Sequence, residues 1–305
     1  MRFSIWPTAA QSWHDIVGLA SHCEQTGWDG VYFADHFMPN SEGTEPLDGD
    51  MLECWSVLAA LAGLVPRVQL GSLVSSVTYR HPAVLANIAT AIDQISGGRL
   101  TLGVGAGWQL NEHAAYGIEL GTVRERLDRF EEAIQVLRSM LGEPRTTFAG
   151  QYFQLYDAPN QPGPVRGRLP LLIGGGGEKR TMRIAARYAD HWNYWSTAPE
   201  QFAQKLSVLR AHCAEAGRDP AEIHVSTQAP LLLSTDQAWL TERRRRPGGR
   251  HPAIIAAPAE MTDIVGRYIE AGAGEFIVPD FTLGAADRKK DTCDLFIEEV
   301  AAAFR

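Results

Sequence analysis

The sequence predicts an α/β protein, a (β/α)8 TIM barrel with insertions after its fourth and seventh strands. Eight apolar runs of strand length alternate along the 305 residues with eight amphipathic helical patterns. Parallel strands need a helix-sized crossover between them, so this alternation predicts a parallel sheet surrounded by helices. A barrel of this kind usually takes about 250 residues, and we therefore expect one domain over the whole chain.

An open, doubly wound sheet is the rival architecture. Such a sheet usually has fewer strands and carries a glycine-rich fingerprint after its first strand. Here the first strand is followed by Pro7-Thr8-Ala9. The closed barrel is therefore favoured.

The predicted elements follow one another in a regular order. The strands are expected at 2–6, 30–35, 68–75, 100–106, 169–174, 190–194, 223–233 and 275–279. The helices are expected at 12–26, 51–64, 82–96, 122–141, 178–188, 199–216, 260–271 and 290–304. Gly27 and Gly272 stand where left-handed caps should end the first and seventh helices. Pro82 and Pro199 stand in the first turn of the third and sixth, where proline is tolerated.

Three long loops interrupt this order, and such loops are usually functional or mobile. Residues 37–50 form a polar loop, and 142–168 contain many prolines and glycines, which predicts a small hairpin. Residues 234–257 contain the run Arg243–Arg246. One hypothesis makes this last loop a mobile lid that orders over an anionic ligand. The alternative is a solvated loop with surface charge.

Composition excludes several classes of protein. The hydrophobic content of 45% and charged content of 21% are typical of a soluble globular enzyme. The net charge of −8 argues against a nucleic-acid partner. We expect no leader and no membrane span, because no apolar stretch of this sequence is long enough for either. The cysteines, which lack metal-type spacing, are expected to be reduced and buried in a cytoplasmic protein without a metal site; they are Cys23, Cys54, Cys213 and Cys293.

Asp35 and His36 come directly after the second predicted strand. The carboxyl ends of barrel strands face one common pocket, so polar residues there are candidates for chemistry. A histidine titrates near neutral pH and can donate or accept a proton. The alternative is that both residues only cap a turn.

Two glycine-rich segments also stand at strand ends. Residues 103–107 read Gly-Val-Gly-Ala-Gly, which lets a ligand approach the backbone but does not have dinucleotide-binding spacing, and no helix is expected directly after it. Gly174, Gly175, Gly176 and Gly177 precede a predicted helix, and bare N–H groups at a helix start favour phosphate. Tight turns are the structural alternative in both places. The small hydroxyl residues of 71–82 suit a flat ring at the barrel mouth, or serve only as a link to the next helix.

These motifs, in this order, resemble the luciferase-like monooxygenase superfamily, and within it the branch of coenzyme F420-dependent oxidoreductases. The matching segments cover nearly the whole chain and are 29–37, 103–108, 111–117, 124–127, 174–181, 186–193 and 276–279. The resemblance implies a (β/α)8 barrel with an insertion. It also implies F420 as the cofactor, with FMN as the alternative.

The resemblance assigns roles by position. His36 would be catalytic and lie over the reactive part of the cofactor ring. Ser72-Leu73 would be the non-prolyl cis peptide against the back of that ring, and Gly174 to Gly177 would hold the phosphate or ribityl chain. The cofactor-binding residues implied in this way are Asp35, Ser72, Leu73, Gly105, Gly107, Gly174, Gly175, Gly176, Gly177 and Trp195.

Two positions depart from the family pattern. Trp108 stands where some F420-dependent dehydrogenases have a proton-donating Glu, which argues against a sugar-phosphate or simple alcohol dehydrogenase. Residues 256–260 replace a Gly-[Ser/Thr]-Pro-Glu segment, which weakens any role of that loop in phosphate contact. The pocket is expected to be aromatic and partly apolar, with Trp6, Trp108, Trp192 and Trp195 near strand ends.

Three functions follow as hypotheses. The favoured one is hydride transfer between F420 and a small organic substrate, with His36 moving the substrate proton. The second is an FMN-dependent two-component monooxygenase supplied by a separate reductase. The third is a non-catalytic flavin-binding barrel. A flavin or deazaflavin reductase partner and a homodimer are further expectations, while nucleic acid and membrane partners are not expected.

Overall fold

Eight parallel strands form a closed barrel in the computed structural model, which describes residues 1–196, 198–245 and 252–305. In barrel order the strands are β3 (Gln69–Ser72), β2 (Gly30–Phe33), β1 (Arg2–Trp6), β13 (Glu275–Pro279), β10 (His224–Gln228), β9 (His191–Trp195), β8 (Leu171–Gly174) and β5 (Leu100–Gly105). Pairing between β5 and β3 closes the circle, and the short β4 (Ser75–Ser76) adds to β5. The predicted fold is confirmed.

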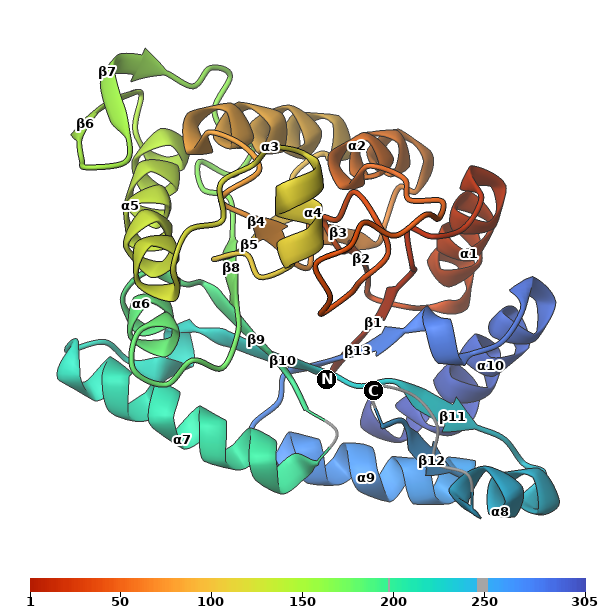
Figure 1. Ribbon diagram of the computed structural model, residues 1–305. Helices are drawn as coiled ribbons and strands as arrows, with labels where there is room; N and C mark the ends of the chain where they lie inside the picture. Colours follow the sequence, from red (N-terminus) through yellow and green to blue (C-terminus); the bar gives the residue numbers. More distant parts are fainter. Residues whose placement is uncertain (197, 246–251) are drawn as a thin grey trace.

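Helices surround this barrel as a ring (Figure 1). The crossover helices are α1 (Trp13–Thr26), α2 (Cys54–Leu64), α3 (Pro82–Ser96), α5 (Val123–Gly142), α6 (Thr181–Tyr188), α7 (Pro199–Glu215), α9 (Pro258–Ala271) and α10 (Ala286–Glu299). The predicted caps are confirmed: Gly27 has φ 91° and Gly272 has φ 110°, both left-handed. Pro82 and Pro199 each begin a helix.

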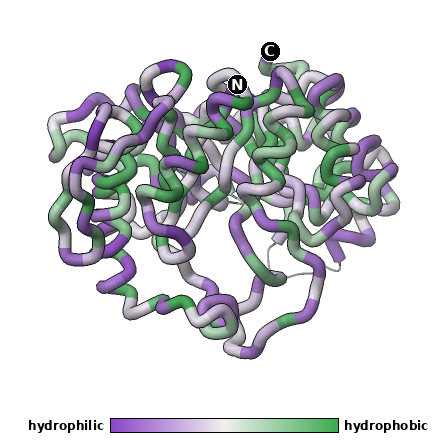
Figure 2. Tube along the Cα trace, turned by 90° about the horizontal axis from the view of Figure 1, so that it is seen from above, coloured by the Kyte–Doolittle hydropathy of each residue, from purple (hydrophilic) through white to green (hydrophobic). Residues whose placement is uncertain are grey.

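Alternation along the strands separates two layers of side chains. In β1, Phe3 packs edge-on against Phe296 of α10, whereas the neighbouring Ser4 donates a hydrogen bond to Glu275 on the barrel side. Residues of the same parity as Ser4 therefore face the barrel interior, and Trp6 is one of them. Figure 2 shows the hydrophobic segments concentrated in the body of the molecule, with the two termini close together at one end.

Polar side chains fill the end of the barrel where the strands begin. The buried carboxylate of Glu275 accepts hydrogen bonds from Arg2 at 2.8 Å and Ser4 at 2.5 Å, and lies 3.0 Å from His224. His191 lies 2.7 Å from the Ser226 hydroxyl. The ligating atoms of His191, His224 and Glu275 lie within 4.8 Å of one another, but each already has a polar partner in the chain. The cluster is therefore explained as a buried polar network.

The insertions lie where they were predicted. Strands β6 (Arg145–Ala149) and β7 (Gln154–Pro159) form an antiparallel hairpin after α5, which confirms the hairpin predicted for 142–168. Its turn is held because the carboxylate of Glu132 accepts from the backbone N–H groups of Gln151 and Tyr152, each at 2.8 Å.

The seventh strand is shorter than predicted. The strand expected over 223–233 ends at Gln228, because Pro230 has no N–H to continue the ladder. Strand β11 (Leu231–Leu233) instead pairs with β12 (Ile254–Ala256) in a separate two-stranded sheet.

The region expected to be a loop at 234–257 contains a helix, α8 (Gln237–Arg245). Arg244 binds Glu260, and Arg243 lies over the ring of Trp239. These two arginines therefore already have partners within the chain, which favours the surface-charge alternative. Residues 246–251, including Arg246, lie outside the described residues, so the lid itself remains a hypothesis.

All four cysteines are buried free thiols, as expected. Within the described residues, no helix is both long and apolar enough to cross a membrane. The described residues also contain short 3-10 turns, namely η1 (Pro220–Glu222), η2 (Asp280–Thr282) and η3 (Ala301–Phe304).

Candidate active site

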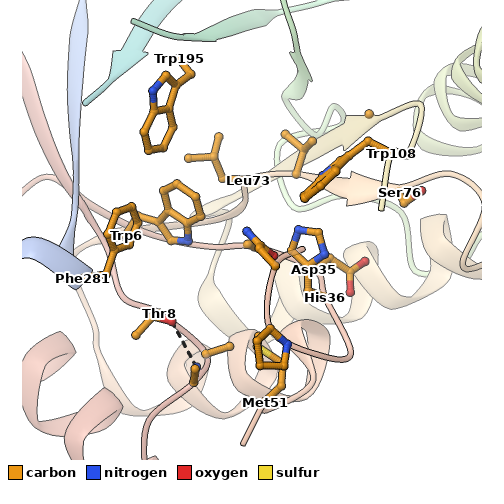
Figure 3. A pocket seen from close by; sticks show the side chains of 18 of the residues that line it. Trp6, Thr8, Asp35, His36, Met51, Leu73, Ser76, Trp108, Trp195 and Phe281 are labelled. Carbon is orange, nitrogen blue, oxygen red and sulfur yellow. Dashed lines mark hydrogen bonds between the residues drawn. The ribbon is translucent and has the colours of Figure 1, made fainter. Parts of the chain in front are cut away.

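A cavity of about 540 Å³ opens at the carboxyl ends of the strands, opposite the Glu275 network (Figure 3). Its volume is in the range of small-molecule sites. The lining residues come from the ends of several barrel strands and from the loops that follow them. They are Trp6, Thr8, Ala9, Ala10, Ala34, Asp35, His36, Pro39, Asn40, Met51, Leu73, Val74, Ser76, Tyr79, Gly105, Gly107, Trp108, Trp195, Gln228 and Phe281.

His36 lies in the wall of this cavity, beside a buried carboxylate. Its Nδ1 atom lies 2.9 Å from Oε2 of Glu112, and the Glu112 side chain is fully buried. The second carboxylate oxygen accepts from the backbone N–H of Phe37. A carboxylate only accepts, so Nδ1 of His36 carries the hydrogen and Nε2 is the ring nitrogen left for the cavity. Trp108 packs edge-on against the imidazole at a centroid distance of 5.6 Å.

The short helix α4 (Leu110–Ala115) supplies Glu112. This helix begins three residues after Gly107, and so not directly after the glycines at 103–107. Figure 1 shows α4 inside the ring of outer helices, in front of the barrel strands. The helix is fixed to the long 37–50 loop, because Gln109 donates to the Pro39 carbonyl at 3.1 Å and Asn111 donates to that of Glu45 at 3.0 Å.

Asp35 is held from behind the cavity. Arg80 donates to both of its carboxylate oxygens, at 2.6 Å and 3.2 Å, and Ser75 donates to one of them. Burial works against the charge of Arg80, but the adjacent Asp35 raises the pKa of the guanidinium above its ordinary value. Asp35 lines the cavity as predicted, but its oxygens are already engaged, so its clearest role is to fix the strand end that carries His36.

Leu73 and Val74 cross the floor of the cavity, and the peptide bond between them is cis. The non-prolyl cis bond expected at Ser72-Leu73 therefore lies one residue further along the chain. The Ser72 hydroxyl does not line the cavity; it donates to the Gly103 carbonyl at 2.7 Å and accepts from the Gly103 N–H at 2.9 Å. The Ser72 side chain was predicted to bind cofactor, but in the structure it links β3 to β5.

Glycines on the neighbouring strands make room for this crossing. A Cβ atom at Gly105 would lie 2.8 Å from Val74, and one at Gly174 would lie 2.9 Å from it. Gly107 has φ 85°, a conformation that favours glycine. Gly105 and Gly107 line the cavity, and their role in cofactor binding stays a prediction.

The run Gly174–Gly177 is not among the residues that line the cavity. Each glycine has a structural reason: a Cβ at Gly176 would meet the Tyr194 ring at 2.3 Å, one at Gly177 would meet Thr181 at 2.8 Å, and Gly175 has φ 119°. Phosphate binding by this run therefore stays a prediction. Steric and conformational requirements already explain why these positions are glycines.

Three of the four tryptophans expected in the pocket are there. Trp6, Trp108 and Trp195 line it. Trp192 does not, because alternation along β9 turns it outward, where it is fully buried and stacks with Phe202 of α7.

Sequence reasoning missed Glu112, Phe281 and Tyr79. Glu112 stood inside a segment that carried the family resemblance, but nothing in its local sequence indicated a partner 76 residues away. The sequence signal that could have led to Glu112 is Trp108, because the missing glutamate at that position calls for a carboxylate from another one.

Burial and the neighbouring Glu112 raise the pKa of Tyr79 well above its ordinary value, so this phenol stays protonated.

The chain belongs to the luciferase-like monooxygenase family, whose model matches residues 1–281. Among curated relatives, an F420-dependent glucose-6-phosphate dehydrogenase of Kineococcus radiotolerans is 31% identical over 238 residues, which are 75% of this chain and 67% of the relative. An F420-dependent hydroxymycolic acid dehydrogenase of Mycobacterium tuberculosis is 31% identical over 229 residues, 73% of this chain and 60% of that protein.

Solved structures show the same fold across the whole chain. An F420-dependent secondary alcohol dehydrogenase, determined with an F420-acetone adduct, superposes with a TM-score of 0.84 at 22% identity and covers 100% of both chains. An EDTA monooxygenase from a Chelativorans species superposes with a TM-score of 0.81 at 14% identity, over 99% of this chain and 93% of that one. At these identities the likeness supports the barrel and no particular chemistry.

Proposed function

We propose that this chain is an F420-dependent oxidoreductase that interconverts a small alcohol and its carbonyl compound, with His36 moving the substrate proton. The departure at Trp108 argued against a simple alcohol dehydrogenase, but Glu112 supplies a buried carboxylate beside His36 from another position. The observation that carries the proposal is the pairing of His36 with Glu112 in the wall of the cavity. The names of the related dehydrogenases support the choice of F420 as cofactor.

The residues of the cavity fit a flat tricyclic ring. Leu73 and Val74 form an apolar floor, and Gly105 and Gly107 beside it have no side chain that would stand in the way. These residues would hold the ring. Coenzyme F420, when bound, supplies a ring carbon that accepts or donates hydride.

The protein supplies position and the proton. Glu112 fixes the imidazole so that Nε2 faces the substrate. In the oxidation direction, Nε2 accepts the hydroxyl proton as the substrate becomes a carbonyl compound, and it returns the proton in reduction. The buried Glu112 carboxylate stabilises the imidazolium that forms in between.

A titration with each cofactor tests the proposal. We expect quenching of tryptophan fluorescence by F420 at micromolar concentrations and weaker quenching by FMN. Tighter binding of FMN, with oxygen consumption when reduced FMN is supplied, would replace the proposal by a monooxygenase. Binding of neither cofactor would favour the non-catalytic barrel. The separate reductase and the homodimer stay predictions.

A further inference from the structure

One side of the cavity is an aromatic wall made of Trp6, Trp195 and Phe281. These residues come from the end of β1, the end of β9 and the turn η2 after β13. Trp6 stands edge-on to Trp195 at 6.1 Å and to Phe281 at 5.9 Å, while Trp195 and Phe281 are parallel at 6.3 Å. Figure 3 shows this wall on one side of Leu73, with His36 and Trp108 on the other.

Apart from His36, the polar groups that line the cavity are neutral or acidic. Besides His36 and Asp35, the polar lining side chains are those of Thr8, Asn40, Ser76, Tyr79 and Gln228, and Trp6, Trp108 and Trp195 add indole N–H groups. Among the described lining residues there is no lysine and no arginine. Apart from His36, whose proton the chemistry uses, the lining therefore offers hydrogen bonds to a neutral molecule but no cationic side chain to an anion.

Arg80 and Lys289 stand behind the lining, and both are paired with carboxylates. A third cation, Arg126, does not line the cavity and donates to the carbonyl of the lining residue Gly107 at 2.7 Å. Arg80 donates to Asp35 and Glu53. Lys289 donates to Asp280 at 2.6 Å, and the same carboxylate accepts from the N–H of Thr8 at 2.8 Å. Moving Arg80 or Lys289 to a ligand would leave a buried carboxylate without its partner, which is strongly unfavourable.

We propose that the substrate is a neutral, largely apolar alcohol or carbonyl compound with an aromatic or cyclic body, and not a phosphorylated sugar. This inference rests on the proposed function. The oxygen of the substrate lies at His36 and its ring packs against the aromatic wall, which suits a flat apolar group through both burial and ring geometry. A phosphate dianion would enter a site with buried Glu112 and Asp35 nearby and with no lysine or arginine among the described lining residues.

A substrate panel on the F420-loaded chain tests this. We expect oxidation of 1-phenylethanol and reduction of acetophenone with reduced F420, and kcat/KM for 1-phenylethanol at least about tenfold above that for glucose-6-phosphate. A preference for glucose-6-phosphate, with F420 bound, would overturn the inference and leave the proposed function intact. Arg246 and Arg250 lie outside the described residues. The measurement with glucose-6-phosphate tests whether these arginines contribute to phosphate binding.

A pair of tryptophan variants tests the wall itself. Trp6→Ala should raise KM for 1-phenylethanol about tenfold and leave the Kd of F420 within a factor of about two, because the lost surface faces the substrate. Trp13→Ala, at an exposed tryptophan in the first turn of α1, is the matched control and should change neither value. An unchanged KM in Trp6→Ala would refute the wall as a substrate surface.

Direct binding separates the two proposals. If F420 does not bind, the proposed function fails, and the affinity of acetophenone for the chain still tests the inference. Isothermal titration should then show acetophenone binding that Trp6→Ala weakens. Binding of glucose-6-phosphate in preference to acetophenone would refute the inference of a neutral, apolar substrate.

Discussion

His36 and Glu112 are 76 residues apart in the chain, yet Nδ1 of the imidazole lies 2.9 Å from Oε2 of the carboxylate. The strand end after β2 supplies one residue and the short helix α4 supplies the other. The pair fixes which ring nitrogen faces the cavity, and so links the fold to the proposed proton transfer.

Replacing His36 should remove the proton carrier and leave the barrel intact. For His36→Ala we expect kcat to fall by about 10²–10⁴, the usual value of a positioned acid or base, with the Kd of F420 little changed. Stopped-flow measurement of F420 reduction checks the rate, and fluorescence titration checks the affinity. Unchanged turnover on a confirmed substrate would exclude His36 from the mechanism.

Replacing Glu112 should act through His36. Glu112→Gln keeps the shape but removes the charge that stabilises the imidazolium, and we expect kcat to fall by about 10–100-fold with a smaller change in KM. The pH profile of kcat should also change, because the variant favours the neutral imidazole. Glu119→Gln, at an exposed surface glutamate, is the control and should match the wild type. A profile for Glu112→Gln that coincides with the wild type would mean that the carboxylate is only structural.

A side chain added at Gly174 should clash with Val74, and shortening Val74 should relieve that clash. A methyl group at Gly174 would lie 2.9 Å from Val74, so Gly174→Ala should lower the free energy of unfolding by about 1–3 kcal/mol. Adding Val74→Ala should recover part of the loss attributable to the clash, as a double-mutant cycle in urea would show.

Gly63→Ala in helix α2 is the control for this cycle, because nothing lies within 4 Å of its added methyl group. This variant should be neutral or more stable by up to about 1 kcal/mol. If Gly174→Ala leaves stability unchanged but weakens F420 binding, the glycine run serves the cofactor and our structural explanation of Gly174 fails.

Stability should fall in acid because of Glu275. Its burial opposes the charge, but the hydrogen bond from His224 and the charge of Arg2 lower its pKa to about 2. A carboxylate with a lower pKa in the folded state stabilises the fold above its unfolded pKa of about 4.5 and loses that contribution toward pH 2. Urea unfolding of the wild type and Glu275→Gln should therefore differ most above about pH 4.5 and converge near pH 2.

His191 also lowers stability in acid, and its effect begins at a higher pH than that of Glu275. Burial and the neighbouring His224 lower its pKa well below 6.5, so it stays neutral in the fold and favours unfolding once the unfolded chain can bind a proton below about pH 6.5. Glu270→Gln, at an exposed glutamate of α9, controls for surface charge and should follow the wild-type pH profile. A constant difference between wild type and Glu275→Gln from pH 7 to pH 2 would contradict the assignment.

The sequence by itself determined the order of the elements. Apolar periodicity, prolines such as Pro82 at helix starts and glycines such as Gly27 at helix ends are local signals, and the structure places them as predicted. The placement of His36 at the mouth of the barrel followed as well, since parallel strands bring their carboxyl ends to one side.

Only the tertiary structure decided which side chains meet. Trp192 and Trp195 stand in one strand, and both are aromatic, but alternation sends the first to the helix layer and the second to the cavity. A strand buried on both faces has no apolar alternation that would reveal this. Glu112 reaches His36 because α4 folds over the mouth, and a contact between distant segments depends on how loops and strands close in space, which local sequence patterns do not encode.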